Sequence, residues 1–203
     1  MKKSFEIGET VRINDIDFVV LDAQESSIEA NYNTKLFLLL KEPIGEVCFN
    51  ADRKKGNNYC DSTLQRAVAQ WFKEFEKNVP HHLLCSRTID LLTLDGQENY
   101  GTMSFQVAPL TIDEFRRYGT VIPECEKSFW LATGRGAPNG GDFGMALVGG
   151  PTKRIDLYLV TDQHAIRPAI MISSQAVEQE RFLKDFSTEE LAAELRRRRN
   201  DHI

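Results

Sequence analysis

The stretch "CDSTLQRAVAQWFKEFEKNVP", Cys60–Pro80, is the strongest helical pattern in the chain, and the rest is interpreted around it. Its large apolar side chains recur three and four residues apart, which places them on one face of a helix: Leu64, Val68, Trp71, Phe72 and Phe75. Asp61 or Ser62 can cap the start, and Pro80 closes the region. Because each large apolar side chain contributes about 1.5–3 kcal/mol when buried, we expect this stripe to hold the helix on a sheet.

The residues before this helix have the composition of β-strands. Three segments are rich in β-branched and aromatic residues and are separated by turn formers: Asp17–Gln24, Ser27–Tyr32 and Lys35–Pro43. The third contains the run LFLLL, Leu36–Leu40, which is continuously apolar rather than alternating. A continuous run predicts a strand buried on both faces.

The residues after the helix predict further strands and a second, shorter helix. A strand is expected within Ser104–Leu110, followed by a helix of about two turns. Thr111 and Glu114 have the spacing of a capping box, and Gly119 stands where the C-terminal cap belongs.

The C-terminal third predicts more strands and then a charged helix. Two strands are expected around a Gly149–Pro151 turn, and another over Ala165–Ser173, where Pro168 favours an edge position or a bulge. Ser187 and Glu190 form a second capping box ahead of the arginine cluster 196–199, which predicts an exposed helix with a thin apolar face.

The glycine-rich segment "FWLATGRGAPNGGDFG", Phe129–Gly144, raises the question of a phosphate-binding loop. Such a loop follows a strand and opens a helix, so that backbone N–H groups face the anion. Here the residues after Gly144 read as a strand, MALVGG, and no GxxG or GK[ST] continuation is present. We therefore interpret the segment as a long irregular loop whose glycines supply positive φ at several points.

Length and composition indicate one domain, with or without an appendage, and exclude several classes of protein. The chain has 203 residues, 41% hydrophobic content and a net charge of −5. No domain-wide basic field exists to neutralise a phosphate backbone, so nucleic-acid binding is not expected. No signal-peptide pattern or membrane-length segment is present, which favours the cytoplasm, or a virion if a phage encodes the protein.

Catalytic and metal-binding motifs are sparse. The four cysteines, Cys48, Cys60, Cys85 and Cys125, have no CxxC spacing, and we expect free thiols, no metal site and no cofactor. Cys85 follows His81 and His82 closely, which leaves a Cys–His pair open, although Pro80 and the intervening leucines favour a turn that enters a strand. No GxSxG, HExxH or SxxK motif occurs.

Five motifs in order resemble a bacterial and phage domain family of unknown function that is related to the C-type-lectin-like superfamily. They are FVVLD with LFLLLKEPI, NYCDSTLQRAVAQWFKEF, FQVAPLTIDEFRRYG, SFWLATGRG and AIRPAIMI, and they span Phe18–Ile172. The superfamily includes formylglycine-generating enzymes and phage receptor-binding proteins. The chain departs from the family pattern at Phe129, where a tryptophan is usual, and at Ala132–Arg135, where the family has Arg-Ser-Pro-Gly.

The resemblance implies an α+β, C-type-lectin-like mixed fold: twisted antiparallel sheets, two main helices, long irregular loops and an extra C-terminal helix. The two ends of the domain would pair in one sheet. We expect one domain over residues 1–174 and a charged helical appendage over 175–203. Four residues are expected to be structural: Trp71, Trp130, Arg167 and Pro168.

The resemblance also implies a ligand-facing region over Gly134–His164. Its candidate ligand-binding residues are Arg135, Asn139, Asp142, Arg154, Tyr158 and His164. A non-catalytic binding module for a protein or glycan is the favoured function. One alternative is a structural or assembly component of a phage particle or larger complex, and self-association through the C-terminal helix is a further possible contact. Another is an oxidase like the formylglycine-generating enzymes, but the cysteine pair that the resemblance requires after Cys125 is missing.

Overall fold

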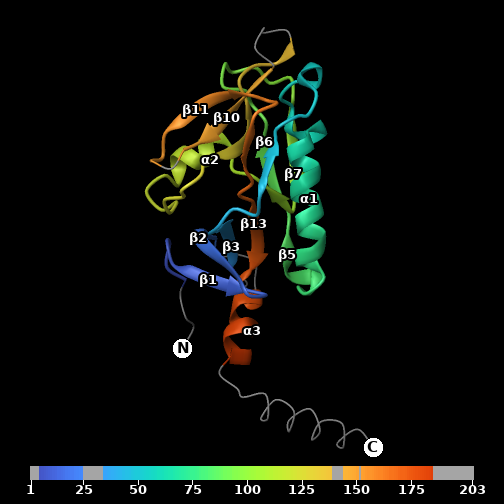
Figure 1. The fold of residues 1–203 in the computed structure, drawn as a ribbon. Helices are drawn as coiled ribbons and strands as arrows, with labels where there is room; N and C mark the ends of the chain where they lie inside the picture. The colour runs from blue at the N-terminus through green and yellow to red at the C-terminus, as the bar shows by residue number, and fades with distance from the viewer. Residues whose placement is uncertain (1–4, 25–33, 139–143, 151, 185–203) are drawn as a thin grey trace, which may run out of the picture.

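The computed structural model describes residues 5–24, 34–138, 144–150 and 152–184. Within these ranges the chain forms an α+β fold of mostly antiparallel sheets and three α-helices (Figure 1). The α+β class expected from the sequence is therefore confirmed. The helices are α1 (Thr63–Glu76), α2 (Ile112–Arg117) and α3 (Ser174–Lys184), with short 3-10 turns at Arg53–Lys55, Tyr59–Asp61 and His81–Leu83.

The first sheet joins the two ends of the described chain. Its strands run in the order β1-β2-β3-β13-β5, and β8 also pairs with β13. The bounds are β1 Thr10–Ile13, β2 Ile16–Gln24, β3 Lys35–Leu40, β5 Leu84–Cys85, β8 Val107–Ala108 and β13 Ala169–Ser173. β3 and β13 pair antiparallel from Ala169 opposite Leu39 to Ser173 opposite Lys35, so segments far apart in sequence share this sheet, as expected.

The expectation that Pro168 marks an edge strand or a bulge is wrong. β13 lies inside the sheet, between β3 on one side and β5 and β8 on the other. Pro168 precedes the first residue of β13, so its missing N–H removes no ladder bond. Its carbonyl accepts a 2.9 Å hydrogen bond from the Leu40 N–H, and the proline thus lies at the entrance of a central strand.

The second sheet carries the C-terminal candidate residues. Its order is β11-β10-β9-β12-β4, in which β9 and β12 are parallel and the other neighbours are antiparallel. The bounds are β4 Glu46–Cys48, β9 Phe129–Gly134, β10 Met145–Gly149, β11 Ile155–Leu159 and β12 Gln163–Ala165. A separate hairpin joins β6 (Arg87–Asp90) and β7 (Thr102–Phe105).

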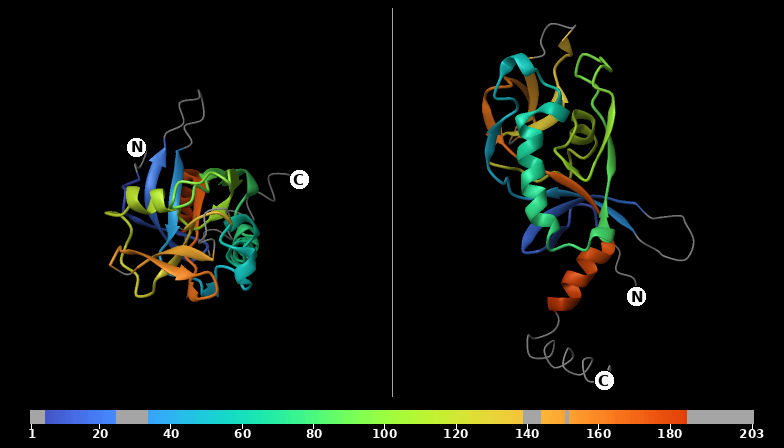
Figure 2. Two further views of the ribbon diagram at one scale, coloured as in Figure 1. Left: turned by 90° about the horizontal axis from the view of Figure 1, so that it is seen from above. Right: turned by 90° about the vertical axis from the view of Figure 1, so that its right-hand side faces the viewer.

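α1 forms as its apolar stripe predicts. The Ser62 hydroxyl accepts a hydrogen bond from the Gln65 N–H at 2.9 Å and so caps the helix. Leu64, Val68, Phe72 and Phe75 are buried. Trp71 is half-buried and stacks on Phe75 with ring centroids 5.4 Å apart. α1 lies lengthwise along one side of the fold (Figure 2).

The continuous run of β3 is buried on both faces, as predicted, because it separates two hydrophobic clusters. Leu36, Leu38 and Leu40 belong to the first cluster, which also contains the α1 stripe and Trp130. Phe37 and Leu39 belong to the second cluster, together with Phe115 of α2 and Phe129. Alternate residues of one strand thus serve two cores.

α2 begins with the predicted capping box. The Thr111 hydroxyl accepts from the Glu114 N–H at 3.2 Å, and the Glu114 carboxylate accepts from the Thr111 N–H at 2.8 Å. Gly119 follows the C-cap residue Tyr118. The predicted turn after Pro80 is also confirmed: His81–Leu83 forms a 3-10 turn that enters β5.

The described glycines at the two ends of the irregular loop have a different role from the predicted one, and Gly140 and Gly141 lie outside the described residues. The loop connects two strands, β9 and β10, as expected. Gly134, Gly136 and Gly144 have no positive φ; each is instead approached closely by another side chain. A Cβ on Gly134 would lie 2.5 Å from Asn57 Cγ, so close packing excludes a side chain at this position.

Two predicted elements lie outside the described residues: the strand Ser27–Tyr32 and the helix that starts at Ser187. α3 continues directly from β13 and lies in the segment where a charged helical appendage was expected, although the sequence did not predict its bounds. It starts where the appendage was expected to begin, and it projects from the end of the sheet (Figure 1). Ala176 and Val177 of its first turn are buried in the first cluster.

Candidate functional site

The structure describes four of the six predicted ligand-binding residues: Arg135, Arg154, Tyr158 and His164. Asn139 and Asp142 lie outside the described residues. Arg154 and Tyr158 belong to the β11 hairpin and His164 to β12, whereas Arg135 directly follows β9.

Tyr158 and His164 are brought into contact by a tight turn. The Leu159 N–H donates to Asp162 Oδ2 at 3.1 Å, and the Asp162 N–H donates to the Leu159 carbonyl at 2.9 Å. This turn reverses the chain between β11 and β12, and the rings of Tyr158 and His164 meet with centroids 4.3 Å apart in an edge-on arrangement. Tyr158 is 39% exposed and so offers an aromatic surface to solvent.

His164 has a restrained ring with one unused nitrogen. Nδ1 lies 2.9 Å from the Ser128 hydroxyl, and the ring meets Trp130 edge-on at 4.7 Å. Nε2 is buried and has no hydrogen-bond partner among the described residues. Burial lowers the pKa of His164 below its ordinary value, while the nearby carboxylates of Asp162 and Glu46 oppose that shift.

Trp130 gives this pair a rigid support. Its side chain is fully buried, and its indole N–H donates to the Val47 carbonyl at 2.7 Å. Its ring also meets Phe49 edge-on, with centroids 5.5 Å apart. A buried and hydrogen-bonded indole fixes the ring against which His164 packs.

The two arginines of the predicted set are not gathered with this pair. Arg154 is exposed near the hairpin turn, four residues from Tyr158 on the same face of β11, which corresponds to about 13 Å along a strand. Its guanidinium lies 4.0 Å from Asp156. Arg135 is half-buried, with Nη1 3.6 Å from the Met145 sulfur. We use "β11–β12 surface" for Arg154, Asp156, Tyr158, Ser128 and His164.

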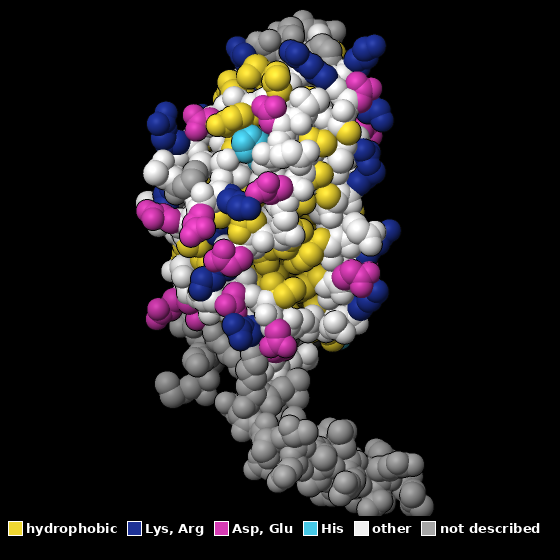
Figure 3. Space-filling view, in the orientation of Figure 1, with side chains coloured by type: hydrophobic (Ala, Val, Ile, Leu, Met, Phe, Trp, Pro, Cys, Tyr) yellow, Lys and Arg dark blue, Asp and Glu magenta, His cyan; other side chains and the backbone are white. Residues whose placement is uncertain are grey.

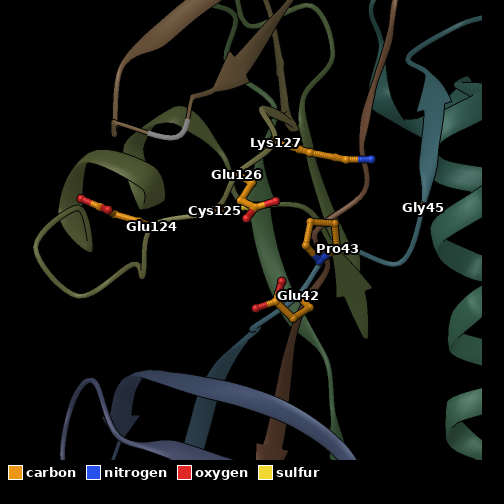
Figure 4. A pocket seen from close by; sticks show the side chains of 7 residues that line it. All are labelled: Glu42, Pro43, Gly45, Glu124, Cys125, Glu126 and Lys127. Atoms are coloured by element: carbon orange, nitrogen blue, oxygen red, sulfur yellow. The ribbon is translucent and has the colours of Figure 1, made fainter.

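A cleft that the sequence did not predict adjoins this surface. Its volume is about 370 Å³, and it is lined by Glu42, Pro43, Gly45, Glu124, Cys125, Glu126 and Lys127 (Figure 4). These residues come from the connection after β3 and the segment before β9, which only the tertiary fold brings together. In Figure 4 the Glu124 carboxylate points away from Pro43, while the Lys127 side chain reaches toward the segment of Gly45.

An ion pair connects the cleft residue Lys127 to β4, the strand that pairs with β12. Lys127 Nζ lies 2.6 Å from Glu46 Oε1. The hydrogen bond and the opposite charge lower the pKa of Glu46 and raise that of Lys127. Ser128, the partner of His164, is the next residue in the chain.

On the face seen in Figure 3, acidic and basic side chains are mixed around exposed hydrophobic side chains.

The arrangement does not form a recognisable catalytic or metal centre. A serine activated by a histidine needs a third group to orient that histidine, and the second nitrogen of His164 has no such partner in the described part of the chain. Within the same ranges, no three His, Cys, Asp or Glu side chains are grouped so that they could hold a metal ion. The four cysteines are free; Cys48 and Cys125 are buried.

Comparison with known proteins adds no assignment: no family model, no curated protein and no solved structure matches the chain. In the described ranges, none of the helices has the length and apolar character needed to cross a membrane. The fold and the contacts above are therefore the basis for a functional proposal.

Proposed function

We propose that the protein is a non-catalytic binding module of C-type-lectin-like type that meets a protein or glycan ligand on the β11–β12 surface. The observation that carries this proposal is the contact between the half-exposed Tyr158 ring and His164, at a centroid distance of 4.3 Å. Aromatic side chains held at a surface supply much of the binding energy in both kinds of recognition.

The surroundings of the pair support a binding role. His164 is fixed by Trp130 and Ser128, so little conformational freedom is lost when a ligand contacts the Tyr158–His164 pair. Arg154 and Asp156 extend the surface with two accessible charges. Binding residues are often found where loops and strand ends stand on a rigid scaffold.

Two features of the architecture support the lectin-like part of the proposal. The strands near the two ends of the described chain share one sheet through the β3–β13 pairing. The second sheet contains β9 and β10, joined by the long glycine-rich connection. Both features agree with what the motif order implies.

The test compares ligand capture by the wild-type chain and by Tyr158→Ala. The probes are lysate and envelope fractions of the source cells for protein ligands and a glycan array for carbohydrates. Met103→Ala on β7 is the matched control, because Met103 is a comparably exposed hydrophobic residue at 45% exposure on another sheet. We expect a ligand that is held by wild type and Met103→Ala and lost by folded Tyr158→Ala. Equal capture by all three proteins would refute this surface as the binding site.

A further inference from the structure

Among the described residues, β11 is an open edge of the second sheet. It pairs with β10 on one side and ends the strand order on the other, on the outer flank of the fold (Figure 1). The opposite end of the sheet, β4, runs into backbone contacts with α1, where the Phe49 carbonyl accepts from the Leu64 N–H at 3.1 Å. Open edges of this kind readily accept another strand.

The hydrogen-bond pattern shows which backbone groups of β11 face outward. The Gly150 N–H donates to the Arg154 carbonyl at 2.7 Å, and the Val160 N–H donates to the Gly144 carbonyl at 3.0 Å. Even-numbered residues of β11 therefore face β10. Because the pattern alternates along an antiparallel strand, the N–H and C=O groups of Ile155 and Leu157 face outward, and no described segment pairs with them.

The open stretch is short and bounded at both ends. Both backbone groups of Leu159 are occupied by Asp162. Lys153, at the other end, has a φ of 62° and belongs to the hairpin turn. The outward backbone groups of Ile155 and Leu157 are therefore the ones open to an incoming strand.

We propose that the occupant of this edge is a second copy of the same chain, paired antiparallel with Ile155 opposite Ile155 of the second copy. In this register Arg154 of each copy lies opposite Asp156 of the other, which forms two cross-strand ion pairs. Opposite charges on directly facing residues stabilise a sheet. The side chains are available, because Arg154 is 78% and Asp156 46% exposed and the two are 4.0 Å apart within one chain.

A pairing shifted by one residue, so that its centre lies at Asp156 instead of Ile155, is disfavoured by charge. That pairing would place Asp156 opposite Asp156 of the second copy, and like charges that face each other destabilise the pair. In the proposed register the two Ile155 side chains also meet on the face where Ile155 packs against the second cluster. In this register the outward backbone groups of Ile155 pair with those of Ile155 in the second copy, whereas Leu157 faces Lys153, whose N–H already donates to the Gly150 carbonyl at 3.0 Å. So short a pairing buries less area than a standard stable interface, and the dimer is therefore weak and depends on concentration.

The experiment measures the molar mass of the full chain by light scattering and sedimentation over a concentration series. It compares wild type, Arg154→Glu, Asp156→Arg and an equimolar mixture of the two variants. Arg154→Glu places two acids on the edge and Asp156→Arg places two bases on it. Each variant repels itself, but the two variants complement each other. Lys73→Glu, an exposed charge reversal on α1, is the control.

We expect wild type and Lys73→Glu to dimerise with rising concentration, each β11 variant to stay monomeric, and the mixture to recover a heterodimer. Circular dichroism verifies that the variants are folded. A wild type that stays monomeric, a dimer that survives in either single variant, or a mixture that fails to associate would each overturn the proposal. Tyr158→Ala leaves Arg154 and Asp156 intact and is expected to dimerise like wild type, so this result is separate from ligand binding.

Discussion

Arg167 Nε donates a 2.9 Å hydrogen bond to the carbonyl of Leu40, at the end of β3. The other guanidinium nitrogens donate to the carbonyls of Lys41 at 3.0 Å and Pro123 at 3.2 Å. The side chain is fully buried, and burial lowers its pKa. One arginine thus connects the ends of three segments: the exit of β3, the approach to β9 and the entrance of β13. The first two of these segments supply the residues that line the cleft.

Arg167→Met is expected to destabilise the fold by about 3 kcal/mol, because methionine fills the space but leaves three buried carbonyls with weaker or no partners. Arg167→Lys is also expected to destabilise, since an ammonium cannot reproduce the planar fork. Urea denaturation measures both changes. Arg116→Met on the exposed side of α2 is the control and is expected to shift stability by less than about 0.5 kcal/mol. An Arg167→Met variant as stable as this control would contradict the assignment.

Asn57 and Gly134 form a coupled pair. Asn57 Nδ2 donates to the Met145 carbonyl at 2.5 Å, and its Oδ1 accepts from the Tyr100 hydroxyl at 2.7 Å. A Cβ on Gly134 would collide with this amide. Gly134→Ala and Asn57→Ala are each expected to cost about 2 kcal/mol. The double variant is expected to be more stable than the sum predicts by at least about 1 kcal/mol, because Asn57→Ala removes the collision. Additive losses in a denaturation cycle would refute the coupling.

Local patterns were sufficient to predict the elements whose residues interact with their neighbours in sequence. The α1 stripe, the Thr111–Glu114 box and the burial of β3 on both faces all follow from spacing alone. Pro168 could not be placed in the same way. The rule that proline cannot donate a hydrogen bond inside a sheet is sound, but the pairing of β13 begins one residue later, at Ala169. The strands that pair with β13 come from distant segments of the sequence.

The candidate site was predictable in part. Tyr158 and His164 lie six residues apart around a turn, so proximity in sequence favoured their contact. The cleft brings together Glu42 and Glu126, and the ion pair beside it joins Glu46 to Lys127, which are 81 positions apart in the sequence. No periodicity signals such a junction. The charged run before β9, Glu124–Lys127, was the available signal, and charged runs more often lie simply in solvent.

Glu114 is expected to matter more than its helix-capping role requires. One carboxylate oxygen closes the capping box, and the other pairs with Arg87, whose side chain is only 4% exposed. Thr111→Ala removes the cap alone and is expected to cost about 1 kcal/mol. Glu114→Ala also leaves a buried guanidinium without its counter-charge and is expected to cost about 3 kcal/mol. Chemical denaturation separates the two values. Equal losses would show that the Arg87 pair contributes nothing.

His164 is expected to make the fold less stable in mild acid. Burial lowers its pKa in the folded state below the ordinary 6.5, so the unfolded chain binds the proton first as the pH falls. Since stability decreases wherever the unfolded state binds more protons at lower pH, the loss begins near the ordinary pKa and ends below the folded one. His164→Gln retains a hydrogen-bonding partner for Ser128 but does not titrate.

The measurement is the difference in unfolding free energy between wild type and His164→Gln across the range from about pH 8 to pH 5. Asp162 and Glu46 are acidic groups near the ring, and both act to raise the pKa of His164. Because burial has the largest effect on the pKa of His164, we expect wild type to lose stability relative to the variant as the pH falls. If the carboxylates dominate instead, wild type gains stability in acid. If the unfolding free energies of wild type and His164→Gln changed with pH in parallel, His164 would have the same pKa in the folded and unfolded chains. That result would contradict the burial of its ring against Trp130 and Tyr158.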